Sequence, residues 1–128
     1  MNVSLPQITR VLIVESVLEL ATLWHRHLVR QGMSVTSVSG QEQAIFHLSA
    51  NDTDIIILDL VIEEGCALAI ADYANYRHPD ARVIFVTNTS FFLDGSIFAH
   101  LANARAFVQS NTPPEDLAAM VAHYGAEL

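Results

Sequence analysis

Two carboxylates of the sequence stand directly after apolar runs, in positions where a side chain can do chemistry. Asp59 follows the four aliphatic residues Ile55–Leu58, and Glu15 follows Val11–Val14. A continuous apolar run is typical of a parallel strand that is covered on both faces. Because desolvating a charge is costly, a carboxylate at the end of such a strand is expected to face a polar crevice, where ligands of open α/β sheets bind. There it can act as a nucleophile or as an oxygen ligand of a divalent ion.

The composition limits the class of protein and its partners. The chain has 128 residues, of which 52% are hydrophobic, so we expect residues 1–128 to form a single domain. Fourteen acids stand against six arginines and no lysine, which argues against a nucleic-acid partner because phosphate binding needs clustered cations. The uncharged stretches are too short to cross a bilayer, and the first residues lack the pattern of a signal peptide. With one cysteine, Cys66, the expected location is cytoplasmic, without membrane association.

Strand-like segments alternate with helical ones along the whole chain. The expected strands are Arg10–Val14, Ser34–Val38, Ile55–Leu58, Arg82–Val86 and Ala106–Gln109. Right-handed crossovers between such units predict an α/β fold, a doubly wound five-stranded parallel sheet with helices on both faces. Periodicity does not determine the strand order. Of the two common orders, 2-1-3-4-5 suits five strands, and its switch point between the first and third strands would gather Glu15, Ser16 and Asp59 around one crevice.

Helix boundaries are predicted from capping residues. Three segments fit the capping box, namely Ser16–Glu19, Ser39–Glu42 and Thr112–Glu115, with Pro113 at the first helical position of the last. Gly32 and Gly65 are predicted to mark a helix end and a turn. Cys66 follows Gly65 near a helix start, and we expect it to be a small packed residue.

Four segments in this order resemble the response-regulator receiver domain (CheY-like) of bacterial two-component signalling, from Arg10 to about Tyr124. The segments are Val11–Ser16, Ile57–Leu60, Val83–Thr87, and Ala106–Ser110 with the following Pro114–Leu117. The resemblance implies a signalling domain of a phosphorelay rather than an enzyme. It would receive a phosphoryl group from a sensor histidine kinase or a phosphotransfer protein, and it would signal by contact with a downstream protein.

The resemblance also assigns roles to individual residues. Asp59 would be the phosphoacceptor, and the Thr87 hydroxyl would contact the phosphoryl group. Phe107 would occupy the aromatic switch position. Ser110 stands where the family has a lysine, and no realignment restores that residue because the chain contains none.

The resemblance further implies a Mg²⁺ site made by Glu15, Asp59 and the backbone carbonyl of Val61. Ser16 stands where the family has a second acid, and we interpret it as a helix cap instead. Mg²⁺ binding should therefore be weakened by the lost ligand. Glu63 or Glu64, in a loop about two residues shorter than usual, could supply an oxygen, although acids at a helix start are the expected interpretation.

Because of these departures, we keep an alternative function, a pseudo-receiver that serves as a docking module without being phosphorylated. The family proline after the lysine position is also absent, replaced by Asn111. A flavin-binding relative of the same fold stays open as well. Phosphate loops of the GxGxxG and GxxxxGK[ST] types are lacking, and a dehalogenase-type phosphatase would need an acid where Val61 stands.

A partner surface is predicted near the last two helices. The region of the expected fourth helix is unusually apolar, with Phe91, Phe92, Ile97 and Phe98. Receivers often dimerise or bind partners through the face made by the fourth helix, fifth strand and fifth helix, so we expect a homodimer or partner contact there. The six histidines show no metal-ligand spacing.

Overall fold

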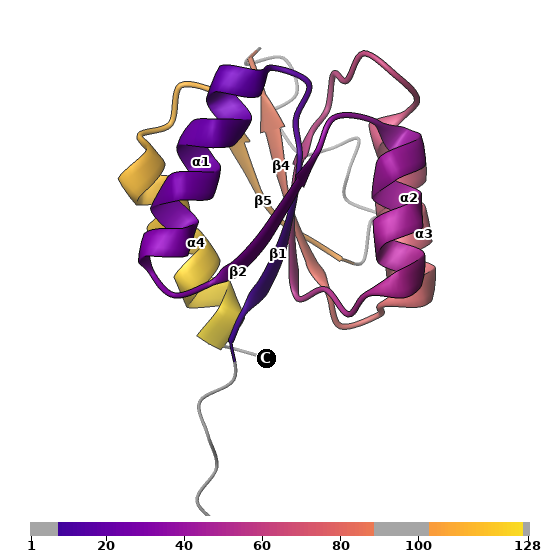
Figure 1. Ribbon diagram of the computed structural model, residues 1–128. Coiled ribbons are helices and arrows are strands. Elements are labelled where there is room, and N and C mark those ends of the chain that lie inside the picture. Colours follow the sequence, from indigo (N-terminus) through magenta and orange to yellow (C-terminus); the bar gives the residue numbers. More distant parts are fainter. Residues whose placement is uncertain (1–7, 89–102, 127–128) are drawn as a thin grey trace, which may run out of the picture.

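The computed structural model describes residues 8–88 and 103–126 and contains one five-stranded sheet in the order β2-β1-β3-β4-β5, with all pairings parallel (Figure 1). The strands are β1 (Arg10–Val14), β2 (Ser34–Val38), β3 (Ile55–Asp59), β4 (Arg82–Thr87) and β5 (Ala104–Gln109). The predicted fold class and strand order are therefore confirmed. Three strands extend one or two residues beyond the predicted bounds, so that Asp59 and Thr87 are the last residues of β3 and β4.

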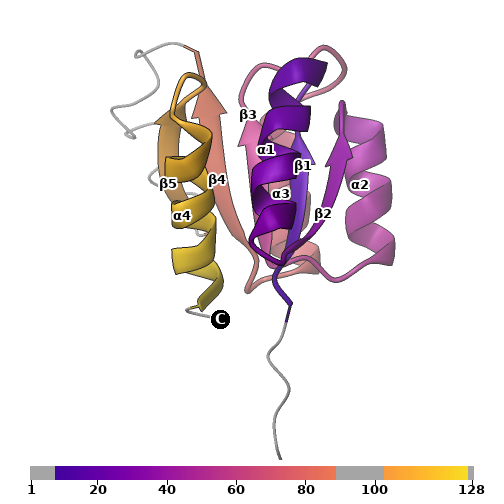
Figure 2. The same ribbon diagram turned by 60° about the vertical axis from the view of Figure 1, so that its left-hand side comes forward.

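Within the described residues, two helices cover each face of the sheet. They are α1 (Leu18–Arg30), α2 (Gln41–Ala50), α3 (Ala67–Arg77) and α4 (Pro114–Ala126). Figures 1 and 2 show α1 and α4 on one face and α2 and α3 on the other. The apolar residues Phe91, Phe92, Ile97 and Phe98 lie outside the described residues, and so does the helix expected between β4 and β5, which was to form part of the partner surface.

Each face of the sheet has its own hydrophobic core. Trp24 and Leu28 of α1 are buried on one face, together with Leu117 and Val121 of α4. On the other face, small and aliphatic residues of α2 and α3 pack against alternate residues of β1, β3 and β4. Burial of a large apolar side chain contributes roughly 1.5–3 kcal/mol, so β3, whose five residues are all buried, is held firmly from both sides. No helix of the described ranges is long and apolar enough to cross a membrane.

The helix ends follow the predictions better than the helix starts. Gly32 has φ 84° beyond the end of α1, and its N–H donates to the Val29 carbonyl at 2.9 Å. The cap of α1 is Val17 and that of α2 is Gly40, neither with a side-chain capping bond, so the capping boxes predicted at Ser16 and Ser39 are wrong. Helix α4 begins at Pro114, one residue after the predicted Pro113.

Candidate functional site

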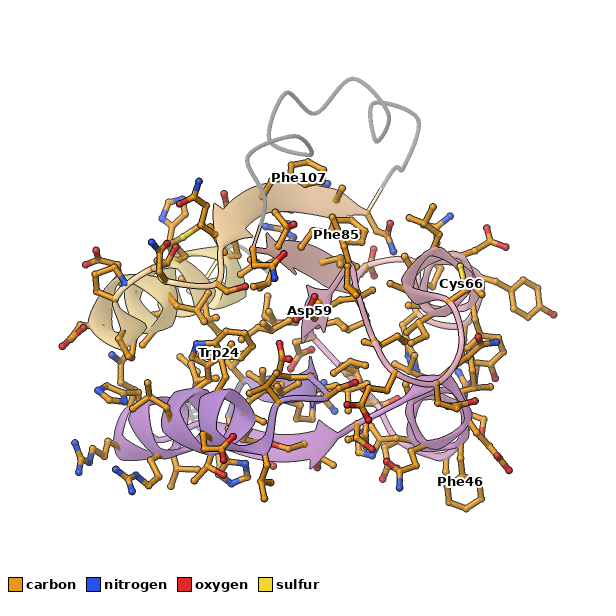
Figure 3. All side chains as sticks on the ribbon, turned by 90° about the horizontal axis from the view of Figure 1, so that it is seen from above. Trp24, Phe46, Asp59, Cys66, Phe85 and Phe107 are labelled. Carbon is orange, nitrogen blue, oxygen red and sulfur yellow. The ribbon has the colours of Figure 1, made fainter. Side chains whose placement is uncertain are left out.

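The parallel register brings the two predicted carboxylates to neighbouring strand ends. Val14 of β1 pairs with Leu58 of β3, and Glu15 and Asp59 are the next residue after each of them. Glu15 and Asp59 therefore occupy neighbouring positions at the carboxyl ends of the two strands. On its other side, Asp59 pairs with Val86 of β4. Figure 3 shows Asp59 near the middle of the carboxyl edge of the sheet, between the two layers of helices. Both residues are buried, with 2% of Glu15 and 9% of Asp59 exposed.

Each carboxylate accepts one hydrogen bond from the loop that follows its own strand. The Val17 N–H donates to Glu15 Oε1 at 3.0 Å, and the Val61 N–H donates to Asp59 Oδ1 at 2.8 Å. Glu15 Oε2 is buried and has no hydrogen-bond partner within the described residues. The side chains of Glu15 and Asp59 lie within hydrogen-bonding reach of each other. An ionised Glu15 therefore leaves one oxygen without a donor and faces a second carboxylate.

These surroundings change the acidity of Glu15. Burial raises the pKa of Glu15, and the contact with Asp59 raises it further, to about 8. A proton on Glu15 removes the like-charge contact with Asp59 and adds a donor to the pair. A divalent cation between the two carboxylates would have the same effect on charge.

The donor set therefore fits a divalent ion, although with few protein ligands. Two carboxylates are brought together, and the described part of the chain contains no group of three or more His, Cys, Asp or Glu able to hold a metal. A Mg²⁺ ion at Glu15 and Asp59 would need its other ligands from the main chain and from water, which Mg²⁺ commonly retains in protein sites.

The Ser16 hydroxyl is engaged neither as a ligand beside Glu15 and Asp59 nor as the cap of α1. It donates to the Ser39 carbonyl at 2.9 Å and accepts from the Glu63 N–H at 2.9 Å. The hydroxyl thus ties together the loops that follow β1, β2 and β3. Its preference for these two loops over its own helix explains why the predicted cap is absent.

The two acids of the loop after β3 lie elsewhere. Glu64 Oε2 accepts from the Glu42 N–H at 3.1 Å, and the Glu64 carbonyl accepts from the Gln41 N–H at 3.0 Å. Glu64 therefore caps α2, although 22 residues separate it from Glu42. Glu63 is exposed and binds Ser16 through its main chain. The helix-start interpretation holds for Glu64, but the helix is α2 rather than the one that follows it.

The predicted phosphoryl contacts lie at the next strand ends. Thr87 is 1% exposed, and its carbonyl accepts from the Ser110 N–H at 2.7 Å. The Val86 carbonyl accepts from the Leu60 N–H at 2.9 Å. The ends of β3, β4 and β5 are thus joined through main-chain bonds. Ser110 lies two strands away from Asp59 in the sheet order.

Phe107 lies on β5 directly beside Phe85 of β4. The two rings are stacked, with centroids 5.3 Å apart and planes 10° apart. Phe107 is half-buried and packs against the core on the α2–α3 face (Figure 3).

Sequence reasoning missed the loop contacts around the site and misplaced Cys66. Cys66 is exposed rather than packed. It directly precedes α3, and its N–H donates to Gln41 Oε1 at 2.7 Å. Gly65 has φ 92°, and a Cβ on it would overlap the Gln41 side chain. The glycine was the only local signal of this close approach.

No protein-family model matches the chain, and no curated protein matches it. Many solved structures, in contrast, are similar to this chain. The signal receiver domain of a Vibrio parahaemolyticus protein is 22% identical, with a TM-score of 0.81 over 94% of this chain and 92% of that one. A CheY-like response regulator receiver domain protein from Methanospirillum hungatei is 19% identical, with a TM-score of 0.85 over 94% and 96%. A Burkholderia pseudomallei response regulator with a phosphorylated aspartic acid and a calcium ion is also 19% identical, with a TM-score of 0.79 over 93% and 69%.

The chain therefore has the fold of the response-regulator receiver domains. At these identities the likeness concerns the fold, and the roles of single residues must come from the geometry of this chain.

Proposed function

We propose that this chain is a receiver domain that accepts a phosphoryl group on Asp59 and signals by contact with other proteins. The observation that supports this most is the buried pair of Glu15 and Asp59, with Glu15 Oε2 lacking a partner among the described residues. Such a pair is costly unless a cation or a proton is shared, and it stands at the strand ends where ligands of this fold bind.

In the proposed reaction, an Asp59 carboxylate oxygen attacks the phosphorus of a phosphohistidine on a kinase or phosphotransfer protein. The oxygen–phosphorus bond forms as the phosphorus–nitrogen bond breaks, and the imidazole nitrogen keeps the electron pair and takes up a proton. The Val61 N–H holds Asp59 Oδ1 at 2.8 Å, which fixes the carboxylate plane before the reaction. This is the positioning that phosphoryl transfer chiefly needs.

A Mg²⁺ ion, where bound, would neutralise charge on the transferred group. Glu15, Asp59 and the Val61 carbonyl would hold it. Ser16 contributes no ligand because its hydroxyl is engaged by Ser39 and Glu63. With two carboxylates and one divalent ion the site is neutral before the reaction, so the weakening comes from the number of ligands and not from charge.

The response to the phosphoryl group would depend on Thr87, Ser110 and Phe107. The hydroxyls of Thr87 and Ser110 offer neutral hydrogen bonds, which are weaker than a charge-assisted contact from an ammonium group. Phe107 would then rotate against Phe85 in response to the rearranged strand ends.

The test is phosphorylation by acetyl phosphate with Mg²⁺, read by mass spectrometry of the intact protein. We expect one phosphoryl adduct, lost in Asp59→Asn and retained in Asp72→Asn, a control in which an exposed acid of α3 is replaced. If the protein gains no adduct from acetyl phosphate or from a cognate kinase, the pseudo-receiver function replaces this proposal. The absence of lysine from the sequence is the observation that favours that second function.

A further inference from the structure

In the part of the chain that the structure describes, strand β2 forms an open edge of the sheet. It is the terminal strand of the order β2-β1-β3-β4-β5 and pairs with β1. The Ser34 N–H donates to the Thr9 carbonyl, and the Val38 carbonyl accepts from the Glu15 N–H, both at 3.0 Å. Since main-chain groups alternate in direction along a strand, Val35 and Ser37 direct their N–H and C=O groups away from the sheet.

This edge lacks the features that usually protect an edge strand. Natural edges carry charged residues, prolines or bulges that prevent pairing with another chain. The sequence of β2 is Ser-Val-Thr-Ser-Val, with β-branched and hydroxyl residues only, and its register with β1 is regular over all five residues. The strand is therefore suited to accept a further strand.

Two open hollows follow this edge on the α2 side and meet at His47. One has a volume of about 610 Å³ and the other about 310 Å³. We call them together the β2–α2 groove, defined by Ser34, Thr36, Val38, Gln43, Phe46 and His47. Phe46 is 75% exposed, and Figure 3 shows it projecting outward from α2, on the opposite side of the molecule from Phe107. A groove between an edge strand and a helix is the shape that binds an extended peptide by strand addition.

The charges around the groove select the kind of segment. Glu42 lines one hollow and Asp52 lines the other. Arg10 also lines the second, and its single positive charge is shared between Asp52 at 3.3 Å and Asp54 at 3.1 Å, so that the two acids and the arginine together keep a net negative charge at this end. Burial, and then the neighbouring His78, lower the pKa of His47, so that residue adds no positive charge at neutral pH. The groove thus offers an acid near each end.

We propose that the β2–α2 groove binds an extended segment of a partner protein, which adds to β2 as a sixth strand and carries a basic residue near each end. Its main chain bonds to Val35 and Ser37, an apolar side chain packs on Phe46, and its cations pair with Glu42 and Asp52. At about 3.3 Å per residue, a segment of about five residues covers β2. A second copy of this chain is a poorer occupant, because β2-to-β2 pairing would bring acidic groups of the two copies together in a protein with net charge −8.

The first test uses the five-residue peptide Ac-Lys-Thr-Val-Thr-Lys-NH2 as probe, in which the two lysines and the valine project to the same face of an extended strand. Binding is followed by amide shifts in two-dimensional NMR. We expect shifts at Val35 and Ser37 and a Kd in the millimolar range or tighter. Replacing both lysines by glutamate should weaken binding at least about threefold at low salt, because the groove ends are acidic. If the β2 amides do not shift, or if the glutamate peptide binds equally well, the proposal is wrong.

Matched variants test the contributions of the Phe46 side chain and of the Ser37 N–H to peptide binding separately. Phe46→Ala should weaken binding at least about fivefold, whereas Tyr76→Ala, which truncates an 82% exposed aromatic residue on α3, should leave it unchanged. Ser37→Pro removes an outward N–H and should also weaken binding about fivefold, whereas Ser37→Ala keeps the N–H and should not. Equal binding by Phe46→Ala and Tyr76→Ala would overturn the proposal. So would a concentration-dependent dimer that Ser37→Pro abolishes, since the occupant would then be a second copy.

Discussion

The buried pair of Glu15 and Asp59 predicts an unusual dependence of stability on pH. Glu15 has a pKa of about 8 in the folded protein, against an ordinary value of 4.5. The folded state therefore binds a proton that the unfolded state has released. This contribution to stability is complete below about pH 4.5 and is lost as the pH rises through about 8.

The expected magnitude follows from linkage. In this interval the free energy of unfolding should fall by at most ~1.4 kcal/mol per pH unit because of Glu15. Glu15→Gln keeps the shape and a hydrogen-bond donor but cannot ionise. Between pH 5.5 and pH 8, the variant should therefore gain up to about 3 kcal/mol relative to the unchanged protein. His47 titrates in the opposite direction, because its pKa is lowered, but its effect cancels in this difference.

The assay is urea denaturation of both proteins at pH 5.5 and pH 8, in EDTA and then in 10 mM MgCl2. In EDTA only the unchanged protein should lose the extra stability at pH 8. Mg²⁺ should restore it there and have a smaller effect at pH 5.5, because a proton then competes for the same carboxylates. Glu19→Gln, which neutralises an exposed acid of α1, is the control. Parallel pH profiles for the unchanged protein and Glu15→Gln would refute the reasoning.

Three further predictions concern the loops and strand ends. Ser16→Ala should lower the free energy of unfolding by about 1–3 kcal/mol, because it removes the hydroxyl that joins Ser39 and Glu63; a thermal melt that matches that of the unchanged protein would contradict the role of this hydroxyl. Gly65→Ala should cost more than Gly32→Ala in urea melts, since both glycines have positive φ but only a Cβ at position 65 overlaps a neighbour, Gln41; equal losses would show that the overlap relaxes freely. Ser110→Lys should enlarge the amide shifts that phosphorylation causes near Phe107, because an ammonium group can pair with the phosphoryl oxygens; unchanged shifts would mean that position 110 does not contact the group.

The sheet could be predicted because its signals are local and strong. Four consecutive aliphatic residues before Asp59, three of them β-branched, favour a buried strand, and the alternation of strands with crossover helices leaves few topologies. The meeting of Glu15 with Asp59 then followed from the chosen strand order 2-1-3-4-5, which makes the first and third strands neighbours, because the carboxyl ends of neighbouring parallel strands share one edge of the sheet.

The loops around the site could not be predicted in this way. The capping-box pattern at Ser16 is a local rule, and it competes with partners that are distant in sequence, Ser39 and Glu63. Similarly, Glu64 caps a helix that begins 23 residues before it. Nothing in the neighbouring sequence reports such pairings, which depend on how three loops meet above the sheet. Cys66 was misplaced for the same reason.

If Asp59 is phosphorylated as proposed, Ser16 in place of a second acid and Ser110 in place of a lysine would act on different steps of signalling. With Glu15, Asp59 and one divalent ion, the charge of the site is zero before phosphorylation, the same total as in a site with a further acid and a lysine. The proposed transfer step would therefore keep its electrostatic balance. The proposed readout step would not, because Ser110 has no charge to bind a phosphoryl group, and its N–H already donates to the Thr87 carbonyl at the end of β4. A phosphoryl adduct on Asp59 would thus establish the chemistry without establishing the switch, and the response of Phe107 has to be measured separately.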